Sequence, residues 1–259
     1  MIESGANAQI KKIKKIKKSA KFRREQGMFA VEGWKMLEEA IRHGLAREIY
    51  ISEHAVPEWE RRAYPEGRPA QVVSEALFRE ISDTVTPQGV LALVETPQYF
   101  LDETADSDGA ALLILENIQD PGNLGTMMRA SEGAGMSGVV LGKGCVDIYN
   151  PKAVRATMGS LFRMPFFLSD NLVSDVERLK GKGFTMYAAH LAGKRAYTEV
   201  SYQGKTGIII GNEANGLSEQ ISSLADCLVR IPMDGQLESL NAAVSAALLM
   251  YEWRRNRPR

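Results

Sequence analysis

The 259-residue sequence is poor in the residue types that build metal sites and disulfide frameworks, with two cysteines and three histidines. Cys145 and Cys227 each lie in an apolar stretch typical of a strand or a strand end, so we predict two buried, reduced thiols. The histidines, His43, His54 and His190, have neither metal-ligand spacing nor an acidic cluster nearby. The sequence therefore predicts no disulfide and no metal.

Long apolar runs are also absent. No stretch approaches the roughly 20 apolar residues that span a bilayer, and the basic N-terminus is not followed by the apolar core of a secretory signal. A composition of 44% apolar and 25% charged residues is typical of a packed globular protein. We expect a cytoplasmic protein of two domains, with no membrane partner.

The net charge is zero, but the charges are distributed unevenly. Residues 1–24 contain nine of the 32 lysine and arginine side chains and a single acid, Glu3. Such a segment, on a chain that is otherwise acidic, favours a polyanionic partner, either a nucleic acid or a membrane surface. A solvated helix face is the alternative, although nine like charges repel one another. If the partner is a nucleic acid, the residues we expect to contact its phosphates are Lys11, Lys12, Lys14, Lys15, Lys18, Arg23 and Arg24.

A narrow apolar stripe runs through this basic segment. Ile10, Ile13 and Ile16 are spaced three apart, which predicts a helix that docks the stripe and leaves its lysines in solvent. A basic amphipathic helix can also lie on a membrane, but three isoleucines without an aromatic residue are a weak anchor.

Two stretches alternate between strand and helix patterns. Residues 25–95 predict a small α/β domain, and the polar residues 96–109 predict a linker. From residue 110 to 259, strands of four to six apolar residues without alternation predict a parallel sheet covered by helices on both faces. Ligands bind outside the carboxyl ends of such strands, so the loops that follow them are the candidate sites. Residues 1–24 are expected to form a separate basic arm.

Two glycine motifs match nucleotide-binding patterns in their residue letters but not in their predicted structural context or in full. Gly133, Gly135 and Gly138 match G-x-G-x-x-G, but they close a predicted helix instead of opening one, which disfavours a nicotinamide dinucleotide. Gly204-Lys205-Thr206 resembles the end of a phosphate-binding loop, but Glu199 stands where its first glycine should be.

Polar residues gather in three loops that follow apolar strands. In the first, Asn123 is the predicted N-cap of a helix, and Arg129 lies six residues later in a stretch with little other charge. A guanidinium there needs an anionic partner, unless it is an ordinary surface arginine. In the second loop, Gly211 permits close approach of a ligand, and Glu213 could pair with Arg129 or hold a ligand amine.

The third loop precedes the long final helix. Ser239 is predicted to cap this helix, with Leu240 and Asn241 in its first turn. Plain helix capping is the alternative explanation for both polar residues.

Together the three loops closely resemble the signature motifs of the SpoU, or TrmH, family of RNA ribose methyltransferases. Asp120 to Arg129 approaches N-x-G-N-x-G-x-x-x-R, Gly211-Asn212-Glu213 matches G-x-E, and Ile231 to Asn241 matches I-P-M-x-G-x-x-x-S-L-N. Asp120 replaces a common asparagine, a loop position where we expect little effect. The N-terminal half is similar to the family's substrate-binding domain, through Phe29–Gly33 and Ser82–Val94.

The resemblance implies a SPOUT fold, in which a C-terminal parallel-sheet domain with a deep trefoil knot follows a small α/β/α substrate-binding domain. It implies S-adenosylmethionine bound by Gly211, Ile231 and Leu240, and a homodimer that packs through the apolar face of the last helix. It also implies a catalytic set made of Arg129, Asn123, Glu213, Ser239 and Asn241.

In the family an arginine at the place of Arg129 has been regarded as the base. A guanidinium has a pKa above about 12 and rarely deprotonates, so we favour stabilisation of the developing alkoxide. The resemblance of the N-terminal domain to that of relatives implies ribosomal RNA of the large subunit as the substrate. A tRNA 2′-O-methyltransferase and an inactive RNA-binding or ribosome-assembly protein are the alternatives.

Overall fold

The computed structural model describes residues 1–64, 69–237 and 239–257. The chain divides into two compact units. Unit 1 consists of residues 1–98 and 147–162, and unit 2 of residues 99–146 and 163–259. Among the described residues, no helix is long and apolar enough to cross a membrane.

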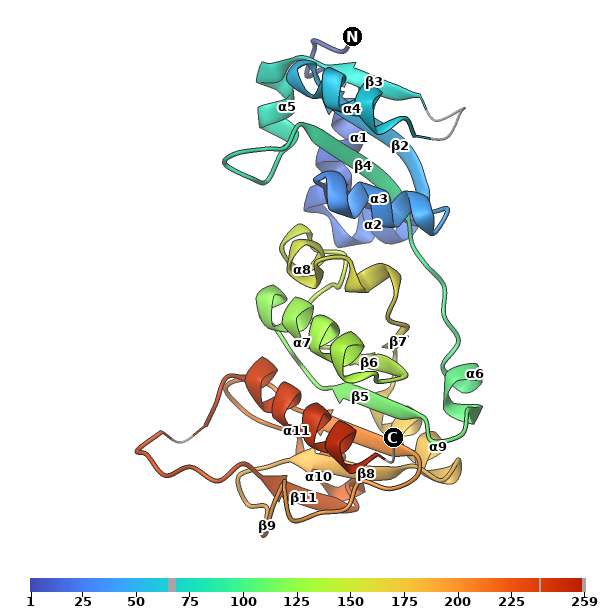
Figure 1. Ribbon diagram of the computed structural model, residues 1–259. Coiled ribbons are helices and arrows are strands. Elements are labelled where there is room, and N and C mark those ends of the chain that lie inside the picture. Colours follow the sequence, from blue (N-terminus) through green and yellow to red (C-terminus); the bar gives the residue numbers. More distant parts are fainter. Residues whose placement is uncertain (65–68, 238, 258–259) are drawn as a thin grey trace. The chain divides into compact units, whose positions relative to one another are not determined.

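Unit 1 is built on a four-stranded mixed sheet (Figure 1). The central strand β4 pairs antiparallel with both β1 and β2, and β2 pairs parallel with the edge strand β3. Burial of five of the six β4 residues reflects helices on both faces. In sheet order, the strands are β1 (Met28–Glu32), β4 (Val90–Glu95), β2 (Ala46–Ser52) and β3 (Ala70–Val73).

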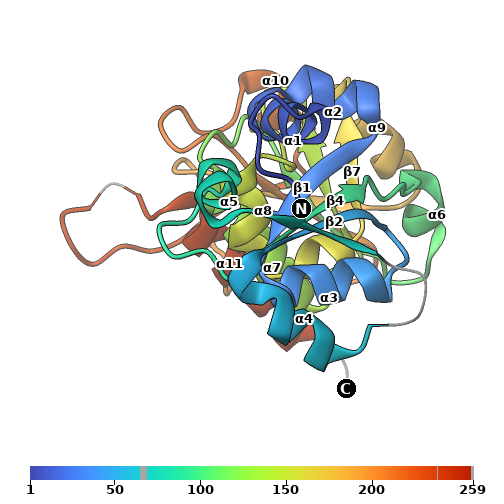
Figure 2. The ribbon, with the colours of Figure 1, turned by 90° about the horizontal axis from the view of Figure 1, so that it is seen from above.

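The basic helix α1 (Ala8–Lys18) covers one face of this sheet together with α5 (Glu75–Ile81). Ile10, Ile13 and Ile16 are fully buried against strand and α5 side chains, so the predicted docking of the stripe is confirmed. Figure 2 shows α1 and α2 (Ala20–Gln26) on one side of the strands, and α3 (Trp34–Arg42) and α4 (Val56–Arg62) on the other. Residues 1–24 are thus built into the α/β/α layers of unit 1.

A segment from between two strands of unit 2 packs in unit 1. Residues 147–162 include α8 (Pro151–Thr157), and Asp147 accepts hydrogen bonds from the Arg23 guanidinium at 2.5 and 2.9 Å. The rings of Phe29 and Tyr149 lie 4.8 Å apart. Three points of the chain therefore connect the two units.

Unit 2 is built on a seven-stranded sheet whose recorded strand pairs are all parallel. Strand β10 lies between β5 and β8, although it follows both in sequence. The two-residue edge strand β9 was not predicted. In sheet order, the strands are β7 (Phe166–Ser169), β6 (Gly138–Gly142), β5 (Ala111–Leu115), β10 (Thr206–Ile210), β8 (Thr185–Ala189), β11 (Cys227–Arg230) and β9 (Arg195–Ala196).

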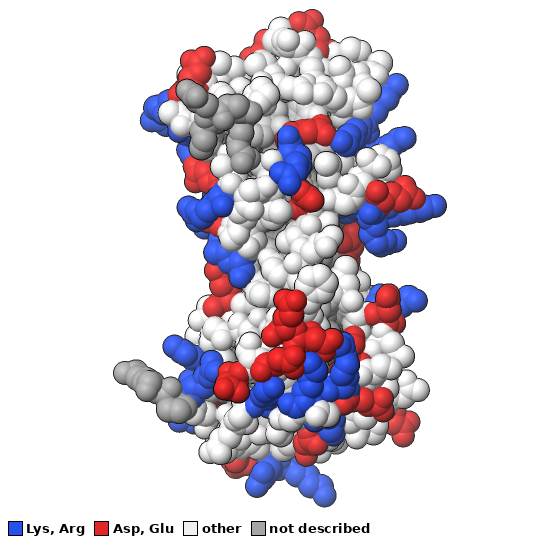
Figure 3. Space-filling model, turned by 90° about the vertical axis from the view of Figure 1, so that its right-hand side faces the viewer, with Lys and Arg blue, Asp and Glu red and all other residues white. Residues whose placement is uncertain are grey.

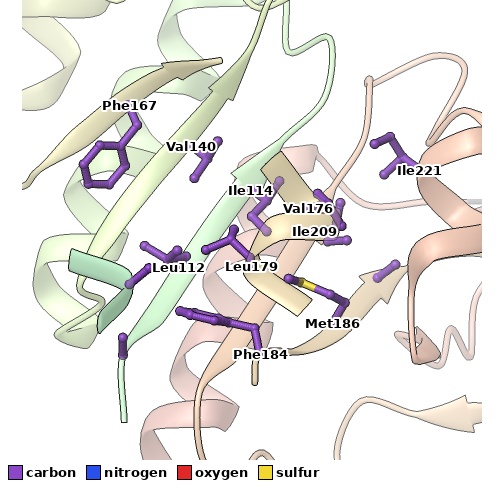
Figure 4. Packing of buried hydrophobic residues seen from close by; sticks show 13 residues of the cluster. Leu112, Ile114, Val140, Phe167, Val176, Leu179, Phe184, Met186, Ile209 and Ile221 are labelled. Atoms are coloured by element: carbon purple, nitrogen blue, oxygen red, sulfur yellow. The ribbon is translucent and has the colours of Figure 1, made fainter. Parts of the chain in front are cut away.

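Helices cover both faces of this sheet, as predicted for a doubly wound domain. Helices α9 (Leu172–Gly181) and α10 (Glu219–Leu224) contribute Val176, Leu179 and Ile221 to a core with Leu112, Ile114 and Ile209 (Figure 4). On the other face, α7 (Pro121–Ala134) packs against α11 (Ala242–Asn256) (Figure 1). A short helix, α6 (Leu101–Asp106), lies within the stretch expected to be a linker.

Candidate functional site

Three polar loops meet where β5, β10 and β11 end. Because β5 and β10 pair in parallel register, Leu115 and Ile210 lie side by side and the loops after them leave the same edge of the sheet. The Asn212 side chain in the second loop donates to the Asn117 carbonyl in the first at 2.8 Å. The sheet thus brings together segments about 95 positions apart in sequence.

The first loop enters α7 one turn earlier than predicted. Asp120 is the N-cap, and its side chain accepts from the Asn123 backbone N–H at 2.8 Å. The predicted cap at Asn123 is therefore wrong. The replacement of a common asparagine by Asp120 is still expected to have little effect, because aspartate and asparagine are equally good N-caps. With its backbone in the first turn of α7, Asn123 has its side chain available for other partners.

A hydrogen-bond chain connects all three loops through side chains. The Asn123 amide donates to the Glu213 carboxylate at 2.9 Å, and the Asn241 amide donates to the Asn123 oxygen at 2.9 Å. The Asn241 oxygen accepts from the backbone N–H groups of Ala243 and Val244, which makes Asn241 the N-cap of α11. The predicted cap at Ser239 is wrong, whereas capping by Asn241 is confirmed.

Arg129 is not part of this chain. It is exposed on α7, and it makes no hydrogen bond or ion pair with the described residues. Of the two possibilities considered for Glu213, pairing with Arg129 is not among the described contacts; the carboxylate accepts instead from Asn123 and from the Gln119 backbone. Arg129 therefore presents an uncommitted cation to solvent.

A cavity of about 620 Å³ opens beside this hydrogen-bond chain, and its size is typical of a cofactor site. Its lining includes all three residues assigned to cofactor binding, Gly211, Ile231 and Leu240, together with Glu213 and Ser239. Most of the lining residues come from the second and third loops. Glu238, inside the third motif, lies outside the described residues.

Glycine is required in the second loop by close packing. A Cβ on Gly211 would lie 2.4 Å from the Gly216 carbonyl carbon, so the two backbone segments touch. Asn212 and Gly216 exchange two backbone hydrogen bonds of 3.0 Å, and the Asn212 side chain accepts from Ala214 and Asn215. These contacts fix the loop conformation, and the residues from Gly211 to Leu217 all line the cavity.

The cavity suits a ligand that carries charges of both signs. Among the described lining residues, Glu213 and Arg230 are the charged pair, and the rest are apolar or neutral polar groups. A carboxylate is a suitable neighbour for a sulfonium or an ammonium, and a guanidinium for a carboxylate. The side chains and backbone groups present therefore fit an amino-acid sulfonium such as S-adenosylmethionine.

Both thiols are free, as predicted, but they are half-buried and not fully buried. Burial raises the pKa of Cys145 to about 11, and its Sγ lies 3.4 Å from the Leu115 carbonyl. Cys145 therefore stays protonated at neutral pH. Among the residues that the model describes, no group of His, Cys, Asp and Glu is arranged to hold a metal ion.

The basic N-terminal residues divide into paired and unpaired groups. Arg23 is 4% exposed, and its guanidinium binds Asp147 and the carbonyls of Ile16 and Lys17, so its assignment to RNA contact is wrong. Lys12 forms an ion pair of 2.5 Å with Glu48. Lys14 pairs with Glu80 at 2.9 Å.

Lys11, Lys15, Lys18 and Arg24 are exposed and make no ion pair with the described residues. They form the free part of the basic segment. Over the face that Figure 3 displays, blue and red side chains lie largely next to one another, consistent with extensive ion pairing. The four unpaired cations on α1 and α2 are therefore the basic residues of this segment that remain available to a polyanionic partner.

An apolar groove lies between α7 and α11. It is lined by Asn123 and Thr126 from α7 and by Val244, Leu248 and Tyr251 from α11, among others. Val244 is 47% exposed and Tyr251 is 52% exposed. Apolar side chains of this size gathered in solvent are characteristic of an interaction surface.

Comparisons with known proteins agree with the motif resemblance. Residues 110–251 match the SpoU rRNA Methylase family, and residues 7–92 match the MRM3-like substrate binding domain. The 23S rRNA (guanosine(2553)-2′-O)-methyltransferase of Bacillus subtilis is 34% identical over 255 residues, covering 98% of both chains.

Two further similarities span both units. The mitochondrial rRNA methyltransferase 3 of Xenopus laevis is 28% identical and covers 95% of this chain and 74% of its own. A crystal structure of an S-adenosylmethionine-bound rRNA methyltransferase from Sinorhizobium meliloti superposes with a TM-score of 0.87 at 29% identity, over 98% of this chain and 97% of the other.

Proposed function

The chain belongs to the SpoU rRNA methylase family, and from that premise we propose that it transfers a methyl group from S-adenosylmethionine to a ribose 2′-hydroxyl of large-subunit ribosomal RNA. The observation that carries the proposal is the hydrogen-bond chain Glu213–Asn123–Asn241 beside a cavity of suitable size. This hydrogen-bond chain joins all three polar loops at the cavity, with Glu213 on the cavity wall.

The cavity residues have separate tasks in this proposal. Backbone groups at Gly211, Ile231 and Leu240 hold the cofactor, which supplies an electrophilic methyl group on a sulfonium. Glu213 lies at the cavity wall and offers a carboxylate to the positive end of the ligand. Ser239 and Asn241 orient the ribose at the entrance to α11.

Arg129 acts on the ribose side. Its guanidinium, which has no partner among the described residues, stabilises the 2′ oxygen as negative charge develops there. It also donates two parallel hydrogen bonds to the adjacent phosphate. Bound S-adenosylmethionine would supply the methyl group to the 2′ oxygen and leave as S-adenosylhomocysteine, and the hydroxyl proton would pass to water. Positioning the two reactants in line supplies much of the rate enhancement.

Unit 1 binds the RNA in this proposal, as a substrate-binding domain followed by the methyltransferase domain. Lys11, Lys15, Lys18 and Arg24 supply phosphate contacts that do not depend on base sequence. Lys12 and Lys14 contribute less, because carboxylates already neutralise them.

We further propose that the enzyme is a cytoplasmic homodimer, which packs through Val244, Ala247, Leu248 and Tyr251 of the groove. Leu240, also expected on this face, precedes α11 and lines the cofactor cavity instead. The bacterial rRNA methyltransferase relatives support this location. The trefoil knot implied by the family stays a prediction, although the placement of β10 between β5 and β8 is compatible with it.

The test is transfer of tritiated methyl groups from labelled S-adenosylmethionine to ribosomal RNA, with Arg129→Ala beside the native enzyme. We expect Arg129→Ala to reduce the rate by a factor on the order of 10² to 10³, while cofactor affinity stays within about twofold. Arg129→Lys retains a cation without the fork and should recover only part of the rate.

Methyl labelling by the native enzyme distinguishes the proposed function from the two alternative functions. Absence of labelling in any RNA, with cofactor binding intact, would favour an inactive RNA-binding or assembly protein. Labelling of tRNA in preference to ribosomal RNA would favour a tRNA methyltransferase. An equal collapse of cofactor affinity in Arg129→Ala would contradict the role given to that residue.

A further inference from the structure

The loop from His190 to Gly193 forms part of the cavity wall and has no task in the function proposed above. It follows β8 at the carboxyl edge of the sheet, and His190 and Leu191 both line the cavity. None of the three signature motifs includes this loop. The inference below rests on the proposed function, because it concerns the same cofactor site.

The hydrogen bonding of His190 fixes its tautomer. The backbone N–H of Ala192 donates to His190 Nδ1 at 3.1 Å, so this nitrogen carries a lone pair and the ring proton is on Nε2. Nε2 makes no hydrogen bond with the described residues. His190 is half-buried as a residue and lines the cavity, so its Nε2–H is left for a ligand or for water.

The loop that carries His190 is held rigidly. The Gly193 N–H donates to the His190 carbonyl at 3.0 Å and closes a tight turn. A Cβ on Gly193 would lie 2.7 Å from the Val229 carbonyl carbon and 2.8 Å from the Arg230 nitrogen, so the turn packs directly on β11. The donor is therefore preorganised, which lowers the entropy cost of binding.

Apolar surface accompanies the donor. Leu191 is 75% exposed and Leu237 is 68% exposed, and both line the cavity. Leucine side chains this exposed in a ligand cavity are suited to cover the face of a purine ring. A donor beside apolar surface is the pattern expected for a nucleoside-binding wall.

We propose that His190 is a cofactor-binding residue that donates its Nε2–H to an acceptor of S-adenosylmethionine, with Leu191 covering apolar surface of the ligand. His190 takes no part in methyl transfer. It contributes to cofactor affinity and selects for a ligand with an acceptor at that point.

Two substitutions distinguish the role of Nδ1 as an acceptor from the role of Nε2 as a donor. In His190→Asn the side-chain oxygen takes the position of Nδ1 and still accepts from Ala192, but no donor reaches the position of Nε2. In His190→Gln the amide nitrogen reaches the position of Nε2 and can donate, but the acceptor for Ala192 is lost. Titration calorimetry with S-adenosylhomocysteine measures both variants against the native chain.

We expect His190→Asn to weaken binding about tenfold, and His190→Gln to stay within about threefold of the native chain. Native-like affinity in His190→Asn would overturn the proposal, because the histidine would then only support the turn. Equal losses in both variants would overturn it as well. Thermal melting of each variant verifies that it is folded.

A second ligand locates the acceptor. Methylthioadenosine lacks the amino-acid end, so a loss that persists with this ligand places the acceptor on the adenosine, and a loss that vanishes places it on the carboxylate. Failure of the native chain to bind either ligand would instead contradict the proposed function itself.

Discussion

At the scale of single residues, the site depends on the order of donors and acceptors in the hydrogen-bond chain Glu213–Asn123–Asn241. Asn123 donates to a carboxylate on one side and accepts an amide on the other, so both ends of its side chain are used. Asparagine fits this position because it carries one donor group and one acceptor group at the same end.

Substituting Asn123→Asp should therefore place two carboxylates in contact. Both cannot ionise at this distance without a cost, so one of the pair acquires a pKa above its unfolded value. Stability lost at high pH is then regained as the pH falls through that raised pKa, since the folded state binds the proton first. At pH 8 we expect a loss of about 1–2 kcal/mol relative to the native chain, with a smaller gap near pH 5.

The measurement is urea unfolding of Asn123→Asp across this pH range, with Asn123→Ala as the control. Alanine removes the same hydrogen bonds but adds no charge, so its stability deficit should not depend on pH. Parallel curves for the two variants would contradict the carboxylate contact.

The close approach at Gly211 supports a second residue-scale prediction. In Gly211→Ala the backbone at Gly216 must shift to admit the new methyl group, because the clash is with backbone and not with a flexible side chain. We expect a loss of about 1–3 kcal/mol in unfolding free energy and more than about tenfold in S-adenosylhomocysteine affinity.

Gly181→Ala is the matched control for this variant. Gly181 ends α9, and a Cβ there would meet nothing within 4 Å, so its stability should change by less than about 0.5 kcal/mol. Native-like cofactor affinity in Gly211→Ala would show that the loop does not hold the ligand.

At the scale of elements, periodicity predicted the helices and strands well, and the ends of helices poorly. The isoleucine spacing of α1 and the unbroken apolar strands of unit 2 were sufficient signals. Asp120 and Asn123 are both good caps, but Pro121 favours the first helical position and marks Asp120 as the cap. The caps of α7 and α11 differ from the predictions because several cap-type residues occur in succession.

Partners of charged side chains could not be predicted, because they come from distant parts of the sequence. Lys12 meets Glu48, and Arg23 meets Asp147 at a separation of 124 residues. These contacts turn some of the expected RNA-binding residues into structural ones. Removal of residues 1–24 would also remove Ile10, Ile13 and Ile16 from the core, so point substitutions are needed to test RNA binding.

Replacing Lys11, Lys15, Lys18 and Arg24 together by alanine should weaken RNA binding and lower its dependence on salt. If each side chain neutralises one phosphate, the slope of log affinity against log salt falls by about three. Filter binding at several salt concentrations measures this slope. Replacing Lys12 and Lys14 removes cations that are already paired, and should change it by less than about one. An unchanged slope in the fourfold variant would place the RNA elsewhere.

At the scale of the whole molecule, the sequence indicated two α/β parts but not how the chain divides between them. Residues 147–162 interrupt unit 2 in sequence and pack in unit 1. Strand β10 inserts between β5 and β8. Local sequence patterns carry no information on strand order, so these features could be known only from a family resemblance or from the structure.

The proposed dimer is a prediction at this scale, since it concerns surface that one chain leaves uncovered. Val244 is 47% exposed on α11 beside Tyr251, and a second copy of the same groove would remove both from water. Val244→Asp places a charge in this contact, where burial without a partner costs several kcal/mol. We expect sedimentation analysis to show a dimer for the native chain and a monomer for Val244→Asp.

The control for this experiment is Leu168→Asp, because Leu168 is 62% exposed on β7 and does not line the groove. This variant gains the same charge and should remain dimeric. Since the proposed active site lies beside the groove, with Asn123 and Asn241 on its wall, the monomer should also lose methyl transfer. A native chain that sediments as a monomer, yet methylates RNA, would remove dimerisation from the proposal and leave the chemistry of the three loops intact.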